Sequence, residues 1–122
     1  PTTALASGLE PRDLSHDETV VKAYINDPLV HDKITFGFGK VMTSVTTWVL
    51  AHAGEFPLPL LLMHGKADRI AFPSRSTEVA EKLKGKCPRV LWNDAYHEVR
   101  NEPEKDDCFK TITLWMDASL RE

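Results

Sequence analysis

The chain of 122 residues has no long hydrophobic run and only two cysteines, and both facts narrow the class of protein. No apolar stretch approaches the roughly 18 residues that a membrane-spanning helix needs. The first five residues do not resemble a secretory signal peptide, so we expect a cytoplasmic location. Cys87 and Cys108 form no C-x-x-C motif, so we expect two reduced thiols in packing roles, with a disulfide or metal role as the minor alternative.

An excess of positive charge is also absent. Fifteen Lys and Arg residues stand against 18 Asp and Glu residues, which gives a net charge of -3 at pH 7. Because no basic stripe stands out, nucleic acid is not an expected partner. The 42% of hydrophobic and 27% of charged residues are typical of a single globular domain.

Helical signals recur along the chain. A capping box formed by Ser15 and Glu18 predicts the start of a helix, which Asp27-Pro28 ends. Apolar residues at spacings of three and four predict a longer helix within residues 33–53, and a third helix is expected after Pro73. A last helix should open near Asn101. Its expected buried face consists of Phe109, Ile112, Trp115, Met116 and Leu120.

Two strands are expected between these helices. Residues 58–63 are almost continuously apolar, which predicts a strand covered on both faces, and residues 89–92 form a second, shorter one. Strands that alternate with helices favour a parallel α/β sheet. A two-stranded sheet cannot cover both faces and both edges of so apolar a strand. We therefore expect partner strands from elsewhere, or pairing with another chain through an open edge.

An aspartate and a histidine follow the two expected strands. Asp68 stands shortly after the first strand and His97 shortly after the second, so parallel strands would bring both to one edge of the sheet. In this order and setting they look like the acid and base of a Ser-His-Asp triad, in which the carboxylate holds the imidazole that moves the proton of the serine. On pattern alone, a turn-forming aspartate and a surface histidine remain open alternatives. Asp94 is a rival acid, although its tight turn favours a turn-forming role, and His64 is expected to make a structural hydrogen bond.

The nucleophile of such a triad is absent from the sequence. No G-x-S-x-G motif, in which a serine stands on a sharp strand-to-helix turn, occurs in the 122 residues. The available serines, none of them on a glycine-flanked elbow, are Ser7, Ser15, Ser44, Ser74, Ser76 and Ser119. We therefore expect the chain to be inactive by itself and to depend on a serine from outside it.

Residues 27–120 resemble the monoacylglycerol lipase group of α/β hydrolases, also described as serine aminopeptidase-like hydrolases. The resemblance is carried by the motifs D-P-L-V (27–30), P-L-L-L-M-H-G (59–65), A-D-R-I (67–70), A-Y-H-E (95–98) and N-E-P-E (101–104). It implies hydrolysis of carboxylic esters with Asp68 as the triad acid and His97 as the base, and neither a metal nor an organic cofactor.

The same resemblance implies an architecture. The chain is expected to be the C-terminal portion of an α/β-hydrolase fold, a parallel sheet flanked by helices, and thus an incomplete domain over residues 1–122. Residues from about 15 to 53 would belong to the helical cap, or lid, over the active site. Residues from about 57 to 122 would supply the strands and helices that carry the triad aspartate and histidine.

The cap and the loop after the triad aspartate offer an expected substrate wall. The candidates to line an acyl pocket are Phe36, Phe38, Val41, Met42 and Ile70. Packing of the cap onto the body of the protein is the alternative role for these side chains. An apolar cap face would also suit peripheral contact with a membrane, although Lys33 and Lys40 are the only basic residues of its long helical stretch, residues 33–53, apart from His52.

Two classes of function therefore remain. The first is a monoacylglycerol lipase-like or lysophospholipase-like esterase that acts on a lipid-like ester and takes its serine from a missing N-terminal half. The second is a non-catalytic fragment or binding module that pairs, with itself or a partner, through its open sheet edge. A peptidase on the same fold is a weaker third reading.

Overall fold

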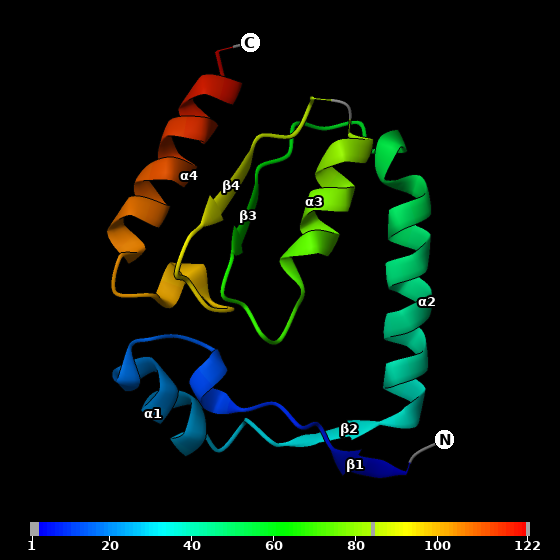
Figure 1. Cartoon of the computed structure of the whole chain (residues 1–122), viewed down its shortest axis with the longest axis vertical. Helices are drawn as coiled ribbons and strands as arrows, with labels where there is room; N and C mark the ends of the chain where they lie inside the picture. Colours follow the sequence, from blue (N-terminus) through cyan, green and yellow to red (C-terminus); the bar gives the residue numbers. More distant parts are fainter. Residues whose placement is uncertain (1–2, 84, 122) are drawn as a thin grey trace.

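The structure, a computed structural model, describes residues 3–83 and 85–121 (Figure 1). Four α-helices and four short strands alternate with three turns of 3-10 helix in this part of the chain. In order they are β1 (Ala4–Ala6), η1 (Pro11–Asp13), α1 (Glu18–Asn26), β2 (Lys33–Thr35), α2 (Phe36–His52), η2 (Ala53–Glu55), β3 (Leu62–Gly65), α3 (Pro73–Lys82), β4 (Arg89–Trp92), η3 (Val99–Asn101) and α4 (Lys105–Ser119).

The strands β3 and β4 form a parallel pair with α3 as the crossover between them. Their register places Gly65 beside Trp92, so both strands end at the same level. In Figure 1, α4 lies on the side of β4, and α3 followed by α2 lies on the side of β3. The predicted parallel α/β arrangement is therefore confirmed. The strand expected at residues 58–63 begins only at Leu62, because Pro57 and Pro59 cannot donate to a strand ladder.

A second ribbon lies apart from this sheet and was not predicted. The strands β1 and β2 pair antiparallel, with Leu5 opposite Ile34. Residues 33–35 are therefore strand rather than the start of the long helix. The Thr35 side chain caps α2 by accepting a hydrogen bond from the Phe38 amide at 3.1 Å, so the helix begins at Phe36 despite the glycines in its first turn.

Two predicted helix caps are wrong. The side chain that caps α1 is Asp17, which accepts from the Thr19 amide, while the Ser15 hydroxyl donates to the carbonyl of Asn101 at 2.8 Å. Asn101 ends η3, and α4 begins after it at Lys105. Both polar residues were interpreted as helix caps, but neither caps the predicted helix. The hydrogen bond between them connects two distant segments, while Ser15 also accepts locally from the Asp17 amide and the Asn101 side chain donates locally to Glu98.

The core is small and contains both cysteines. Its buried apolar residues are Leu14, Val21, Ala53, Leu83, Cys87, Val99 and Cys108. Both thiols are free, as expected, and burial raises the pKa of each. The predicted buried face of α4 is only partly right. Cys108 points inward, whereas Phe109 and Met116 are exposed and Leu120 is 82% exposed.

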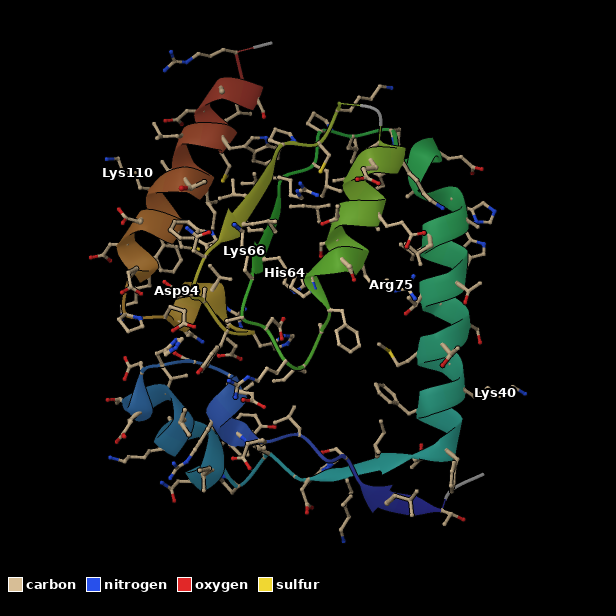
Figure 2. All side chains as sticks on the ribbon, viewed as in Figure 1. Lys40, His64, Lys66, Arg75, Asp94 and Lys110 are labelled. Carbon is tan, nitrogen blue, oxygen red and sulfur yellow. The ribbon has the colours of Figure 1, made fainter. Side chains whose placement is uncertain are left out.

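The helix α2 presents apolar side chains to solvent along most of its length. Its exposed large apolar residues are Phe36, Phe38, Val41, Met42, Val45, Trp48 and Val49. Its C-terminal end is held to α3, where the Lys82 ammonium donates to the Leu50 carbonyl at 2.6 Å. In Figure 2, Lys40 points away from the rest of the chain and Arg75 lies between α3 and α2. No helix among the described residues combines the length and hydropathy needed to cross a membrane.

Candidate active site

The loops that follow β3 and β4 are joined by backbone hydrogen bonds at the common end of the two strands. The Lys66 amide donates to the Trp92 carbonyl at 2.8 Å, and the Ala67 amide donates to the Ala95 carbonyl at 3.1 Å. Gly65 makes this approach possible, because a Cβ atom there would overlap the carbonyl oxygens of Ala95 and Tyr96. The two loops therefore leave the sheet in contact with each other.

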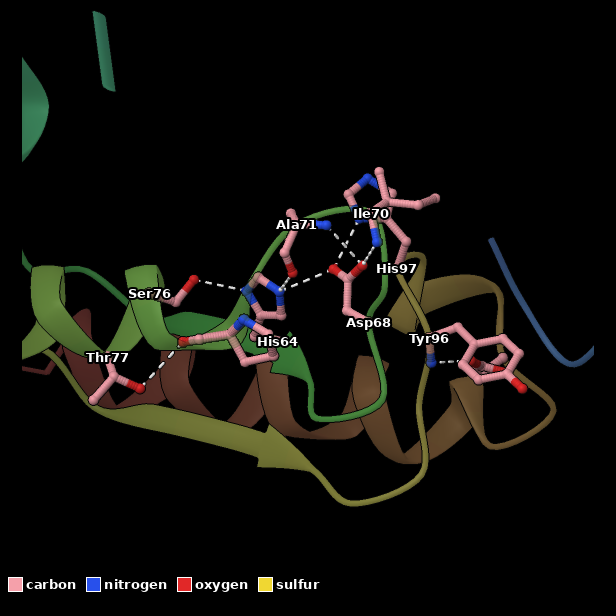
Figure 3. Close-up of polar contacts among 10 residues, drawn as sticks. His64, Asp68, Ile70, Ala71, Ser76, Thr77, Tyr96 and His97 are labelled. Atoms are coloured by element: carbon pink, nitrogen blue, oxygen red, sulfur yellow. Dashed lines mark hydrogen bonds and ion pairs between the residues drawn. The ribbon is translucent and has the colours of Figure 1, made fainter. Parts of the chain in front are cut away.

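Asp68 and His97, the two predicted triad residues, meet between these loops. The Nδ1 atom of His97 lies 2.9 Å from Oδ2 of Asp68 (Figure 3). Asp68 is only 6% exposed, and its other oxygen, Oδ1, accepts from the amides of Ile70 at 2.8 Å and Ala71 at 2.9 Å. A buried carboxylate is stable only when its lone pairs are satisfied, and here they are.

The protonation of this pair follows from its contacts. Burial raises the pKa of Asp68, but the hydrogen bonds from the Ala71 amide, His97 and the Ile70 amide outweigh it, and the net pKa lies below the ordinary 3.8. Asp68 is therefore ionised at neutral pH and can only accept. Nδ1 of His97 must then donate to it, which leaves Nε2 of a neutral ring without a proton and able to take one.

The loop of His97 is held by the segment that precedes α1. The amide of His97 donates to the Asp13 carbonyl at 3.3 Å, and the amide of Glu98 donates to the Leu14 carbonyl at 2.8 Å. The Asp13 side chain also forms an ion pair with Arg69 at 3.2 Å, which connects this segment to the loop of Asp68. Residues far apart in the sequence thus fix both loops.

Glu102 completes this support, a role that was not predicted from the sequence. Its carboxylate is 3% exposed and accepts from the Tyr96 amide at 2.5 Å, the His16 amide at 2.9 Å and the Ser15 hydroxyl at 3.4 Å. The ring of His16 lies 3.1 Å from the same carboxylate and stacks on Tyr96 at 3.7 Å. The sequence held two signals, the place of Glu102 shortly after His97 and its place in the N-E-P-E motif, but two of its partners, Ser15 and His16, lie 87 and 86 residues away.

An open cavity of about 830 Å³ lies beside the Asp68 loop. Three of the five predicted substrate-wall residues line it, namely Phe38, Met42 and Ile70, while Phe36 and Val41 are exposed outside its lining. The cavity is linked to the Asp68–His97 pair through Ile70, whose side chain lines it and whose amide binds Asp68. Its walls are mainly apolar, with charged side chains that include Arg69 at one side.

The parallel strand pair flanked by helices is the C-terminal portion of an α/β-hydrolase fold, and the chain is therefore an α/β hydrolase by class. Within that class, the chain belongs to the serine aminopeptidase S33 family, whose model matches residues 1–104.

Several proteins and solved structures of α/β hydrolases are similar to this chain. An uncharacterized abhydrolase domain-containing protein of Dictyostelium discoideum is 32% identical over 118 residues, which are 95% of this chain and 13% of that protein. A monoacylglycerol lipase of Mycolicibacterium smegmatis is 29% identical over 92% of this chain and 41% of its own length. The crystal structure of the Paleococcus ferrophilus monoacylglycerol lipase superposes with a TM-score of 0.91 at 33% identity, over 98% of this chain and 47% of that one. The chain therefore spans less than half the length of these relatives.

Proposed function

We propose that this chain supplies the acid and the base of a Ser-His-Asp triad that hydrolyses carboxylic esters of the monoacylglycerol type. The observation that carries the proposal is the hydrogen bond of 2.9 Å between Asp68 and His97 on loops that follow adjacent parallel strands. Membership of a hydrolase family and the likeness to two monoacylglycerol lipases support the ester as the substrate class.

In the proposed reaction, Nε2 of His97 takes the proton of a serine hydroxyl as its oxygen attacks the ester carbonyl. The proton then passes to the glycerol oxygen as the ester bond breaks, leaving an acyl-serine. Water then attacks the acyl-serine and gives one proton to His97. His97 passes this proton to the serine oxygen as the acyl–serine bond breaks, which releases the fatty acid and restores the serine hydroxyl and the neutral imidazole. Asp68 holds the tautomer of His97 and stabilises the imidazolium that forms in each half-reaction. The serine and the oxyanion hole come from sequence outside these 122 residues.

The cavity beside Ile70 is the proposed acyl pocket. Phe38 and Met42 reach it from α2, in the stretch that the resemblance assigns to the cap, and Ile70 reaches it from the loop of Asp68. An apolar wall adjoining an acid–base pair suits an ester with a hydrocarbon chain. In this proposal the exposed apolar side chains of α2 face the substrate and the missing half of the protein, and α1 and α2 are the cap.

A binding module is the alternative, and one observation favours it. In the part of the chain that the structure describes, the β3–β4 sheet has only two strands, so both outer edges are open to pairing. Such a module would bind a partner strand and would hydrolyse no ester. A chain bearing G-x-S-x-G that accompanies this one separates the two functions.

Ester hydrolysis by the purified protein, together with any chain that accompanies it, tests the proposed roles. We expect Asp68→Asn to lower kcat by about 10³- to 10⁴-fold, because the amide stabilises the wrong tautomer of His97. The matched control Asp94→Asn, an exposed carboxylate in the same loop as His97, should change kcat less than about twofold. A loss caused by Asp94→Asn instead would reject the assignment of the acid.

A further inference from the structure

We infer that His64 is a positioning residue of the proposed triad, acting on His97 through Asp68. The Nε2 atom of His64 lies 2.9 Å from Oδ2 of Asp68, the same oxygen that faces His97 (Figure 3). His64 comes from β3 and points toward α3 (Figure 2). The inference rests on the proposed function for its effect on the reaction, but its geometry can be tested without any activity.

The contacts of His64 fix where its proton lies. Nε2 faces two groups that can only accept, the carboxylate of Asp68 at 2.9 Å and the carbonyl of Ala71 at 3.0 Å. Nε2 must therefore carry a hydrogen. At the other side of the ring, Nδ1 lies 2.7 Å from the hydroxyl of Ser76, which can donate to it. His64 thus holds the Nε2–H tautomer and His97 the Nδ1–H tautomer, and both donate to one oxygen.

This arrangement gives the carboxylate of Asp68 a hydrogen-bond donor for each of its four lone pairs. Two backbone amides use Oδ1, while the two imidazoles share the two lone pairs of Oδ2. Ala71 contacts both side chains, because its amide donates to Oδ1 of Asp68 and its carbonyl accepts from Nε2 of His64. The hydrogen bond from His64 occupies one lone pair of Oδ2, and the remaining lone pair accepts from His97. His64 also withdraws negative charge from Oδ2, which moderates how strongly Asp68 favours the imidazolium of His97.

Ring nitrogens labelled with ¹⁵N in the wild-type protein test the geometry directly. We expect the Nε2 signal of His64 to be that of a protonated nitrogen at pH 7, and the Nδ1 signal of His97 likewise. Asp68→Ala, which removes the common acceptor, should shift both ring proton signals. A bare Nε2 on His64 would overturn the inference whether or not the protein hydrolyses esters.

Two substitutions of His64 separate its donor from its bulk. The amide nitrogen of glutamine reaches the place of Nε2, whereas that of asparagine reaches only the place of Nδ1, beside Ser76. We expect His64→Asn to lower kcat by about 10- to 100-fold with KM within about twofold, and His64→Gln to keep kcat within about threefold of wild type. Equal losses in the two variants, or none in either, would show that the donor to Asp68 has no role in positioning.

The pH profile of kcat/KM gives a readout that packing alone would not move. Without the hydrogen bond from His64, Oδ2 of Asp68 keeps more negative charge, which favours the imidazolium of His97. We therefore expect the midpoint of the acid limb to lie about 0.3 to 1 pH unit higher in His64→Asn than in the wild type. In His64→Gln the midpoint should be unchanged. Arg69 is paired with Asp13, Glu98 with Arg100, and Glu102 contacts the ring of His16. These groups, together with Lys66 and Asp94 in the same loops, are the same in both variants. An acid limb that stays in His64→Asn would overturn the inference. If the esterase proposal fails, no variant has activity, but the tautomer of His64 can still be measured.

Discussion

Glu102 accepts a hydrogen bond of 2.5 Å from the amide of Tyr96, the residue before His97. The same carboxylate binds Ser15 and His16, so it connects the loop of His97 to the segment before α1. Together with the bonds from His97 and Glu98 to the carbonyls of Asp13 and Leu14, Glu102 joins the segment before α1 to the C-terminal part of the chain beside the Asp68–His97 pair.

Removal of the Glu102 carboxylate should lower the stability of the fold. We expect Glu102→Ala to lower the free energy of unfolding by about 2 to 4 kcal/mol, because the partly buried amides of Tyr96 and His16 and the buried hydroxyl of Ser15 lose their acceptor. Urea unfolding measures the change, and Glu104→Ala, an exposed neighbour, should stay within about 0.5 kcal/mol of wild type. Similar values for the two variants would show that the Glu102 contacts contribute little.

Gly65 should tolerate no side chain. A Cβ atom at Gly65 would overlap the backbone of Ala95 and Tyr96, which cannot move aside as a flexible side chain does. We expect Gly65→Ala to destabilise the fold by about 1 to 3 kcal/mol and to displace the loop of His97.

Gly39→Ala is the matched control, because a Cβ placed there on α2 meets no atom within 4 Å beyond the adjacent residues and the backbone of its own helix. It should leave the unfolding midpoint unchanged or raise the stability by up to about 1 kcal/mol. A harmless Gly65→Ala would contradict the close approach of the two loops.

Stability at acid pH should report the ionisation of Asp68. Its pKa in the folded chain lies below the ordinary 3.8, so its contribution to stability is complete above that pH and is lost as the pH falls through the folded value. The comparison is made from about pH 5 downward, below the range in which histidines ordinarily titrate, because both His97 and His64 contact Asp68. Over that range we expect the difference in unfolding free energy between wild type and Asp68→Asn to shrink as the pH falls below about 3.8. A difference that stays constant to below about pH 3 or grows from about pH 5 downward would contradict a lowered pKa of Asp68.

Phe38 and Phe36 form a natural pair for testing the acyl pocket. They lie on the same helix with exposed fractions of 53% and 58%, but only Phe38 lines the cavity. We expect Phe38→Ala to lower kcat/KM for long-chain esters by about 5- to 30-fold relative to acetate esters, because contact area with the chain is lost. Phe36→Ala should alter this ratio less than about twofold. The reverse order would move the pocket to the other side of α2.

Local signals predicted the segment from α3 to β4 well. Pro73 begins α3, Arg89–Trp92 is the strand that its apolar residues indicated, and Gly85 adopts a positive φ of 83° after the helix. The pairing of β1 with β2 could not be predicted in this way, because strands of three residues leave no periodicity to read.

At the site, too, local sequence patterns predicted the placement of Asp68 and His97 but not the long-range hydrogen bonds that support them. The order of strand and aspartate, then strand and histidine, predicted that Asp68 and His97 share one sheet edge, and they are hydrogen-bonded there. Their supports were missed because the bonds from Ser15 and His16 to Glu102 depend on how the chain folds back over more than 80 residues. Ser15 makes a local and a long-range hydrogen bond, to the Asp17 amide and the Asn101 carbonyl, and a local sequence pattern can indicate only the first.

The most direct test of the central claim is intact mass spectrometry of the purified protein, with any chain that accompanies it, after treatment with a fluorophosphonate serine probe. The account predicts a single adduct on a serine outside these 122 residues, formed rapidly in the wild type and at least about 10³-fold more slowly in His97→Ala. An adduct that forms at the same rate without His97, or no adduct at all, would contradict the claim that this chain supplies the base.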